Sequence, residues 1–95
     1  MTLEELYNTI LFRRKEMPEG SYVASLFRDG DDRIIQKVGE EAVEVVIAAK
    51  NESRERVISE VADLVFHTLV LLTSKGITLS DILDELERRK ATPAK

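Results

Sequence analysis

Two stretches of about twenty residues, 31–50 and 54–75, repeat their apolar residues at helical spacing with only a narrow acidic strip between them. The strips consist of Glu40, Glu41 and Glu44 in the first stretch and of Glu60 and Asp63 in the second. A helix that is apolar on nearly every side is buried on nearly every side. We therefore expect both strips to face inward, on the two long central helices of a bundle.

The remaining sequence is helical as well, because capping residues precede apolar residues at helical spacing and no segment alternates like a strand. The expected caps are Thr2, Ser21, Asp31 or Asp32, Ser53 and Thr78. About five helices follow: 3–16, one from Ser21 to the Asp29-Gly30 turn, one to Lys50, 54–75 before Gly76, and one from Thr78 through Leu86. This predicts an all-α helical bundle that forms a single domain over residues 1–95, with a frayed tail from about residue 91.

Composition excludes several classes of protein. Lys and Arg number 14 and Asp and Glu 18, a net charge of −4, which argues against a nucleic-acid partner. The absence of Cys excludes disulfides, zinc–thiolate sites and a Cys nucleophile. The N-terminus carries carboxylates where a signal peptide is basic, and charges interrupt the apolar stretches. We therefore expect a cytoplasmic protein with no membrane partner.

The second long helix predicts self-association. Its apolar residues extend almost all the way round the helix, and a chain of 95 residues is too short to bury such a helix by itself. A second copy supplies the missing surface, so we expect a homo-oligomer, specifically a homodimer.

Carboxylates that face inward need compensation, since desolvation and mutual repulsion otherwise raise their pKa values until some protonate. A hard divalent cation removes this problem. The pairs Glu41-x-x-Glu44 and Glu60-x-x-Asp63 present only oxygen ligands, which suit Mg²⁺, or Mn²⁺, better than Zn²⁺. The predicted metal ligands are thus Glu41, Glu44, Glu60 and Asp63. The alternative is an acidic face exposed to solvent, with no metal.

The motif Glu40-Glu41-x-x-Glu44, followed by Glu60-x-x-Asp63, resembles the signature of the all-α nucleoside-triphosphate pyrophosphohydrolases. Three longer strings, at 21–26, 33–41 and 62–72, resemble the phosphoribosyl-ATP pyrophosphohydrolase family, and the likeness runs from about Leu3 to Arg89. The resemblance implies a nucleotide substrate and Mg²⁺-dependent conversion of phosphoribosyl-ATP to phosphoribosyl-AMP and pyrophosphate in histidine biosynthesis.

Two features depart from the family pattern. Val23 stands where many members have Thr. The family also occurs fused to a cyclohydrolase domain; from the length and the absence of Cys, we expect this chain to be the stand-alone form.

The resemblance assigns roles in catalysis. Glu40, Glu41 and Glu44 are the expected catalytic residues, and Glu40 either serves a second metal or orients the attacking water; its alternative is a solvent-facing position. Lys37 either holds a substrate phosphate or pairs with Glu41 one turn along the helix. His67 is either a hydrogen-bond partner of Asp63, a packing residue or a catalytic group.

Four further residues are candidates for phosphate binding, and a purely structural role is the alternative. Arg33 lies one turn before Lys37, and Lys50 either reaches a phosphate or complements the helix dipole. Ser21 and Tyr22 open a helix whose backbone N–H groups suit an anion, or are a cap and a core anchor. Two alternative functions remain: a house-cleaning pyrophosphatase for non-standard nucleotides, and a non-enzymatic helical dimerisation module.

Overall fold

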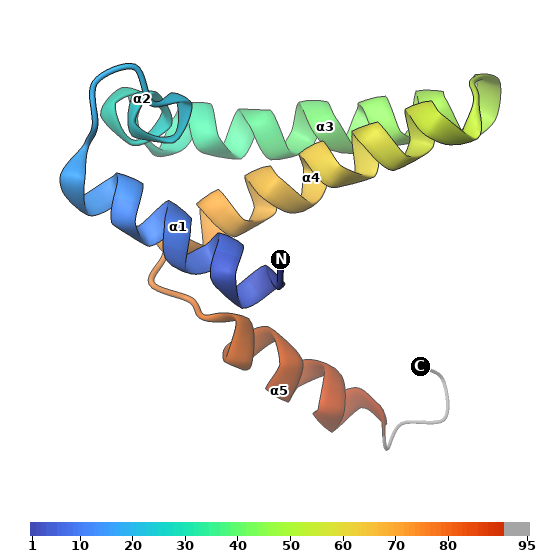
Figure 1. Cartoon of the computed structure of the whole chain (residues 1–95). Helices are drawn as coiled ribbons and strands as arrows, with labels where there is room; N and C mark the ends of the chain where they lie inside the picture. The colour runs from blue at the N-terminus through green and yellow to red at the C-terminus, as the bar shows by residue number, and fades with distance from the viewer. Residues whose placement is uncertain (91–95) are drawn as a thin grey trace.

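The computed structural model describes residues 1–90, which contain five α-helices and no strand (Figure 1). The helices are α1 (Leu3–Glu16), α2 (Tyr22–Asp29), α3 (Asp31–Asn51), α4 (Arg54–Ser74) and α5 (Leu79–Lys90). The predicted all-α fold is thereby confirmed. The frayed tail that the sequence predicts from about residue 91 lies outside the described part of the chain.

Most helix starts follow the predicted caps. Thr2 and Glu5 form a complete capping box, and the Ser21 hydroxyl accepts a hydrogen bond from the Ala24 N–H at 3.1 Å. The N–H groups of Thr78 and Asp81 are satisfied reciprocally by each other's side chains at 2.9 and 3.1 Å. These bonds use the N–H groups that a helix start leaves without a partner.

The predicted cap of α3 is wrong. Gly30, not Asp31 or Asp32, precedes the helix, and its φ of 98° belongs to the region that glycine adopts most readily. Because Gly30 ends α2 and begins α3 at the same residue, no position is left for a side-chain cap. Asp31 instead receives a hydrogen bond from Lys75 Nζ at 2.9 Å and another from the Ser74 hydroxyl, which ties the start of α3 to the end of α4.

Helices α3 and α4 form a long antiparallel hairpin, with α1 and α2 packed around one end of it (Figure 1). The buried apolar core lies at that end and comprises Tyr7, Ile10, Val23, Leu26, Ile34, Leu69 and Val70. The other end, formed by the last half of α3 and the first half of α4, extends beyond α1 and α2. The acidic residues of both helices lie between these two ends.

Helix α4 has the length and mean hydropathy, 1.5, of a membrane span by composition alone. It nevertheless packs along α3 and α1 and buries the polar side chains of Glu60 and His67. Ionisable side chains are rare within membrane-spanning helices, because it is costly to remove them from water. We therefore interpret α4 as the core helix of the bundle.

Candidate metal centre

Three carboxylates from two helices converge in the middle of the hairpin. Glu41 of α3 and Glu60 and Asp63 of α4 each offer an oxygen atom, and these oxygens lie within 4.8 Å of one another. Glu60 and Asp63 share a face of α4 because they are three residues apart. Glu41 and Glu60 are buried, whereas Asp63 is exposed. We call these three residues the acidic group.

Lys37 borders the acidic group. Its Nζ lies 3.3 Å from Glu41 Oε1 and 3.6 Å from Glu40 Oε1. Burial lowers the pKa of Lys37, but the hydrogen bond to Glu41 and the negative charges nearby outweigh it, so the net direction is upward. The ammonium is therefore charged at neutral pH. The ion pair with Glu41 that the sequence offered as one role of Lys37 is present, and its phosphate role stays a prediction.

Glu40 and Glu44 lie beside the acidic group on α3 but are both exposed. Glu40 accepts a hydrogen bond from Gln36 Nε2 at 3.0 Å, which is the main cause that lowers its pKa, with a further contribution from Lys37. Glu40 is thus ionised at neutral pH. Glu44 is near enough to Arg56 for its charge to raise the pKa of that guanidinium. Neither residue belongs to the acidic group. The catalytic roles of Glu40 and Glu44, and the role of Glu44 as a metal ligand, therefore stay predictions.

Arg56 is a residue of this site that the sequence reasoning missed. Its guanidinium is shared between Glu52, at 3.3 Å, and the buried Glu60. The hydrogen bond to Glu52 and the charge of Glu60 raise the pKa of Arg56. The signal was present in the sequence, because Glu52, Arg56 and Glu60 follow one another at the four-residue spacing of helical ion pairs.

The donor set fits a hard divalent cation. Three carboxylates offer oxygen ligands only, and two of them are removed from bulk water. Lys37 and Arg56 each neutralise one buried carboxylate, Glu41 and Glu60 respectively. The exposed Asp63 leaves the group open to solvent on one side, where water and a substrate can enter.

Tyr22 and Arg33 meet close to this centre. Tyr22 is the first residue of α2; its ring stacks on Phe66 at 6.2 Å, and the Arg33 guanidinium lies over it at 5.7 Å. Arg33 also forms an ion pair with Asp29. Ser21 has the capping role that the sequence offered as one alternative. For Ser21, Tyr22 and Arg33, phosphate binding stays a prediction.

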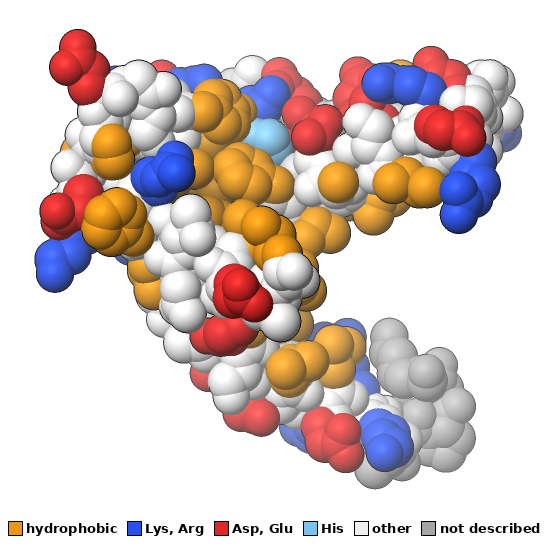
Figure 2. All heavy atoms as spheres, viewed as in Figure 1, with side chains coloured by type: hydrophobic (Ala, Val, Ile, Leu, Met, Phe, Trp, Pro, Cys, Tyr) orange, Lys and Arg blue, Asp and Glu red, His pale blue; other side chains and the backbone are white. Residues whose placement is uncertain are grey.

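His67 is buried against Tyr22, between hydrophobic and acidic side chains (Figure 2). Its Nδ1 lies 2.8 Å from the backbone carbonyl of Asp63, and its Nε2 lies 2.8 Å from the Tyr22 hydroxyl. His67 thus contacts the backbone of Asp63 and not its carboxylate, so its expected role as a partner of that side chain stays a prediction. The bond to Tyr22 joins residues 45 positions apart and has no local sequence signal.

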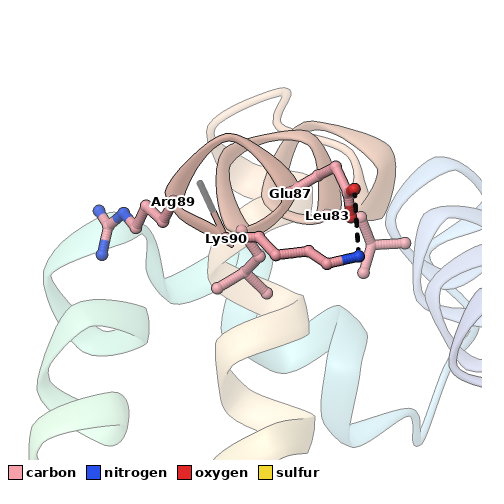
Figure 3. A pocket seen from close by; sticks show the side chains of 5 residues that line it. Leu83, Glu87, Arg89 and Lys90 are labelled. Carbon is pink, nitrogen blue, oxygen red and sulfur yellow. Dashed lines mark ion pairs between the residues drawn. The ribbon is translucent and has the colours of Figure 1, made fainter. Parts of the chain in front are cut away.

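Two features lie apart from the acidic group. Lys50 is exposed in the last turn of α3, about 14 Å along the helix axis from Glu41, so its phosphate role stays a prediction. A pocket of about 690 Å³ lies on α5 and is lined by Leu83, Leu86, Glu87, Arg89 and Lys90 (Figure 3). Its carboxylate, Glu87, already pairs with Lys90 at 3.8 Å. This pocket has no group of converging acids, so we place the candidate centre on α3 and α4.

Comparison with known proteins agrees with this geometry. Residues 3–90 match the model of the family described as phosphoribosyl-ATP pyrophosphohydrolase. The chain belongs to this family. The resemblance seen in the sequence is thereby confirmed, and it covers all five helices of the phosphoribosyl-ATP pyrophosphohydrolase fold described above.

Individual family members are similar over nearly the whole chain. A phosphoribosyl-ATP pyrophosphatase of Metallosphaera sedula is 59% identical over 92% of this chain and 94% of its own length. One from Geobacter sulfurreducens is 52% identical over 95% of this chain and 83% of its own length. The histidine biosynthesis bifunctional protein HisIE of Caldanaerobacter subterraneus is 54% identical over 92% of this chain, which spans 42% of that longer protein.

Proposed function

We propose that this protein is a hydrolase that converts phosphoribosyl-ATP to phosphoribosyl-AMP and pyrophosphate in histidine biosynthesis, with Mg²⁺ as its cofactor. The observation that carries the proposal is the acidic group of Glu41, Glu60 and Asp63 within a chain that matches this family over residues 3–90. We further propose that residues 1–95 act as one catalytic domain in the cytoplasm.

The acidic group would hold Mg²⁺, and Glu44 would complete its ligands from the next turn of α3. When bound, the ion neutralises charge that develops on phosphate oxygens. Lys37 and Arg33, one turn apart on α3, bind the phosphates. Glu40, ionised and exposed, accepts a hydrogen bond from the attacking water and orients it. Ser21 and Tyr22, at the start of α2, would contact the outer phosphates, and Lys50, in the last turn of α3, would reach the substrate only at a distance from the acidic group.

The proposed reaction has a direct test. Pyrophosphate release is measured from phosphoribosyl-ATP, ATP and dUTP, each with and without Mg²⁺. We expect rapid release from phosphoribosyl-ATP alone, abolished by chelation of the metal. Equal or faster release from dUTP would favour a house-cleaning enzyme, and no release together with a melting temperature that ignores Mg²⁺ and nucleotide would favour a dimerisation module.

We propose that the working form is a homodimer, with an exposed apolar face of the α3–α4 hairpin as its interface. One face of α3 is apolar and exposed: Ile35, Val43, Val46 and Ile47. It continues onto α4 through Ile58 and Val61. Gly39 lies on the same face of α3 with open space where a Cβ would stand, which suits the close approach of a helix from a second copy.

The dimer predicts a simple measurement. Light scattering at micromolar concentration should give twice the 10.8 kDa mass of one chain. Val46→Glu, at a position 60% exposed in the single chain, should shift the protein to monomers because it places a charge inside the interface. Leu3→Glu, at 54% exposure on α1, is the matched control and should remain dimeric. A monomeric unmodified protein would overturn the dimer proposal.

A further inference from the structure

A continuous chain of side-chain contacts joins the backbone beside the acidic group to a cation expected to bind phosphate. It starts at the Asp63 carbonyl, 2.8 Å from His67 Nδ1, and continues from His67 Nε2 to the Tyr22 hydroxyl at 2.8 Å. The Arg33 guanidinium then lies over the Tyr22 ring. The contacts therefore link α4, α2 and α3.

The hydrogen bond to the Asp63 carbonyl fixes the place of one proton on the imidazole. A backbone carbonyl only accepts hydrogen bonds, so His67 Nδ1 carries the proton. In the neutral ring, Nε2 is then an acceptor and receives the hydrogen bond of the Tyr22 hydroxyl. His67 thus uses both nitrogens to hold neighbouring groups, and neither is left to take a proton from substrate or water.

The Tyr22 ring depends on this bond for its position. The side chain is at the surface, with Tyr22 44% exposed, while His67 is only 6% exposed. Phe66 supports one side of the ring by stacking, and the edge of His67 meets the ring at 5.7 Å. Without the bond to His67, the Tyr22 hydroxyl loses the one hydrogen bond that it forms within residues 1–90, and the ring beneath the Arg33 guanidinium is no longer fixed at that end.

We propose that His67 is a positioning residue, which fixes Tyr22 and through it holds the Arg33 guanidinium beside Lys37 to receive the phosphates of a nucleotide substrate. This inference rests on the proposed function. Arg33 and Lys37 are four residues apart on α3 and therefore share a face. Tyr22 also lies near enough to Lys37 to act on the pKa of that ammonium. Arg33 also forms an ion pair with Asp29, so the Tyr22 ring is one of the contacts that place its guanidinium.

Two substitutions of His67 separate its two bonds. In His67→Gln the side-chain amide reaches about as far as Nε2 and can still accept from Tyr22, whereas in His67→Asn it ends near Nδ1 and keeps only the Asp63 carbonyl. We expect His67→Asn to raise KM for phosphoribosyl-ATP by about tenfold with kcat changed less than about threefold. The KM of His67→Gln should stay close to the wild-type value.

Tyr22→Phe completes a double-mutant cycle. It removes the hydroxyl, so it should raise KM as His67→Asn does, and the double variant should be no worse than either single one. A purely structural role for His67 predicts a lower melting temperature with KM unchanged in assays well below it. That result, or additive effects in the double variant, would overturn the inference.

The imidazole also gives a signal that does not depend on turnover. His67 is the single histidine of the chain, so the ¹⁵N spectrum of histidine-labelled protein at neutral pH reports this ring alone. We expect the proton on Nδ1. A proton on Nε2 overturns the inference even if the enzyme is active. A wild-type protein that does not hydrolyse phosphoribosyl-ATP overturns the proposed function and this inference with it.

Discussion

Asp63→Asn should lower kcat for phosphoribosyl-ATP hydrolysis on the order of a thousandfold, which corresponds to about 4 kcal/mol of transition-state stabilisation. The substitution keeps the shape of the side chain and removes one anionic oxygen from the acidic group. Asp63 is exposed and forms no ion pair within residues 1–90, so the folded state loses little. The melting temperature without metal should therefore be unchanged or slightly higher, since repulsion among the carboxylates is relieved.

Two comparisons make this prediction sharp. Asp84→Asn is the matched control, because Asp84 is an exposed aspartate on α5, away from the acidic group. Glu44→Gln should cause a loss like that of Asp63→Asn if Glu44 is a ligand, as the sequence predicts. Steady-state kinetics over a range of Mg²⁺ concentrations measures all three. If Asp63→Asn turned over normally at saturating Mg²⁺, the acidic group would not be the metal centre.

The helices could be predicted from the sequence because their signals are local. Thr2, Ser53 and Thr78 cap helices where the sequence places them, since a cap depends on residues only three positions apart. Gly76 follows Lys75, the C-cap of α4, and has the left-handed conformation that the sequence predicts there, with a φ of 68°. The error at α3 has a non-local cause: Asp31 resembles a cap, but its carboxylate binds Ser74 and Lys75, which are 43 and 44 positions away in the sequence.

The members of the acidic group were harder to choose. Glu40, Glu41 and Glu44 lie within a sector of about 100° on α3, and the rotation of α3 against α4 decides which of them turns inward. In the structure that residue is Glu41, while Glu40 and Glu44 stay exposed. Periodicity alone cannot fix this rotation. The contact between Tyr22 and His67 was likewise out of reach, because it depends on how α2 crosses the hairpin.

Lys37→Met should lower kcat/KM by about ten- to a thousandfold, or roughly 1.4–4 kcal/mol of transition-state binding. A metal ion held by carboxylates acts only on the phosphate oxygens that it contacts. A separate cation is therefore needed to bind the remaining phosphate oxygens of the substrate. Lys37 is charged and only partly buried, at the edge of the acidic group. The Lys37 ammonium pairs with Glu41; a metal ion held by Glu41 would compete for that carboxylate and would leave the ammonium available to a phosphate oxygen.

The same variant separates the two roles of Lys37, because Met keeps most of the packing volume and removes only the charge. Binding of Mg²⁺ should be unchanged or slightly tighter, since a competing positive charge beside Glu41 is gone. Lys15→Met, at an exposed position in the last turn of α1, is the matched control and should leave kcat/KM unchanged. Normal kinetics with a lower melting temperature would instead mean that Lys37 serves only as the ion-pair partner of Glu41. Arg at this position should restore activity poorly, because a planar guanidinium does not reproduce a compact ammonium in a place where three carboxylates and a polyphosphate converge.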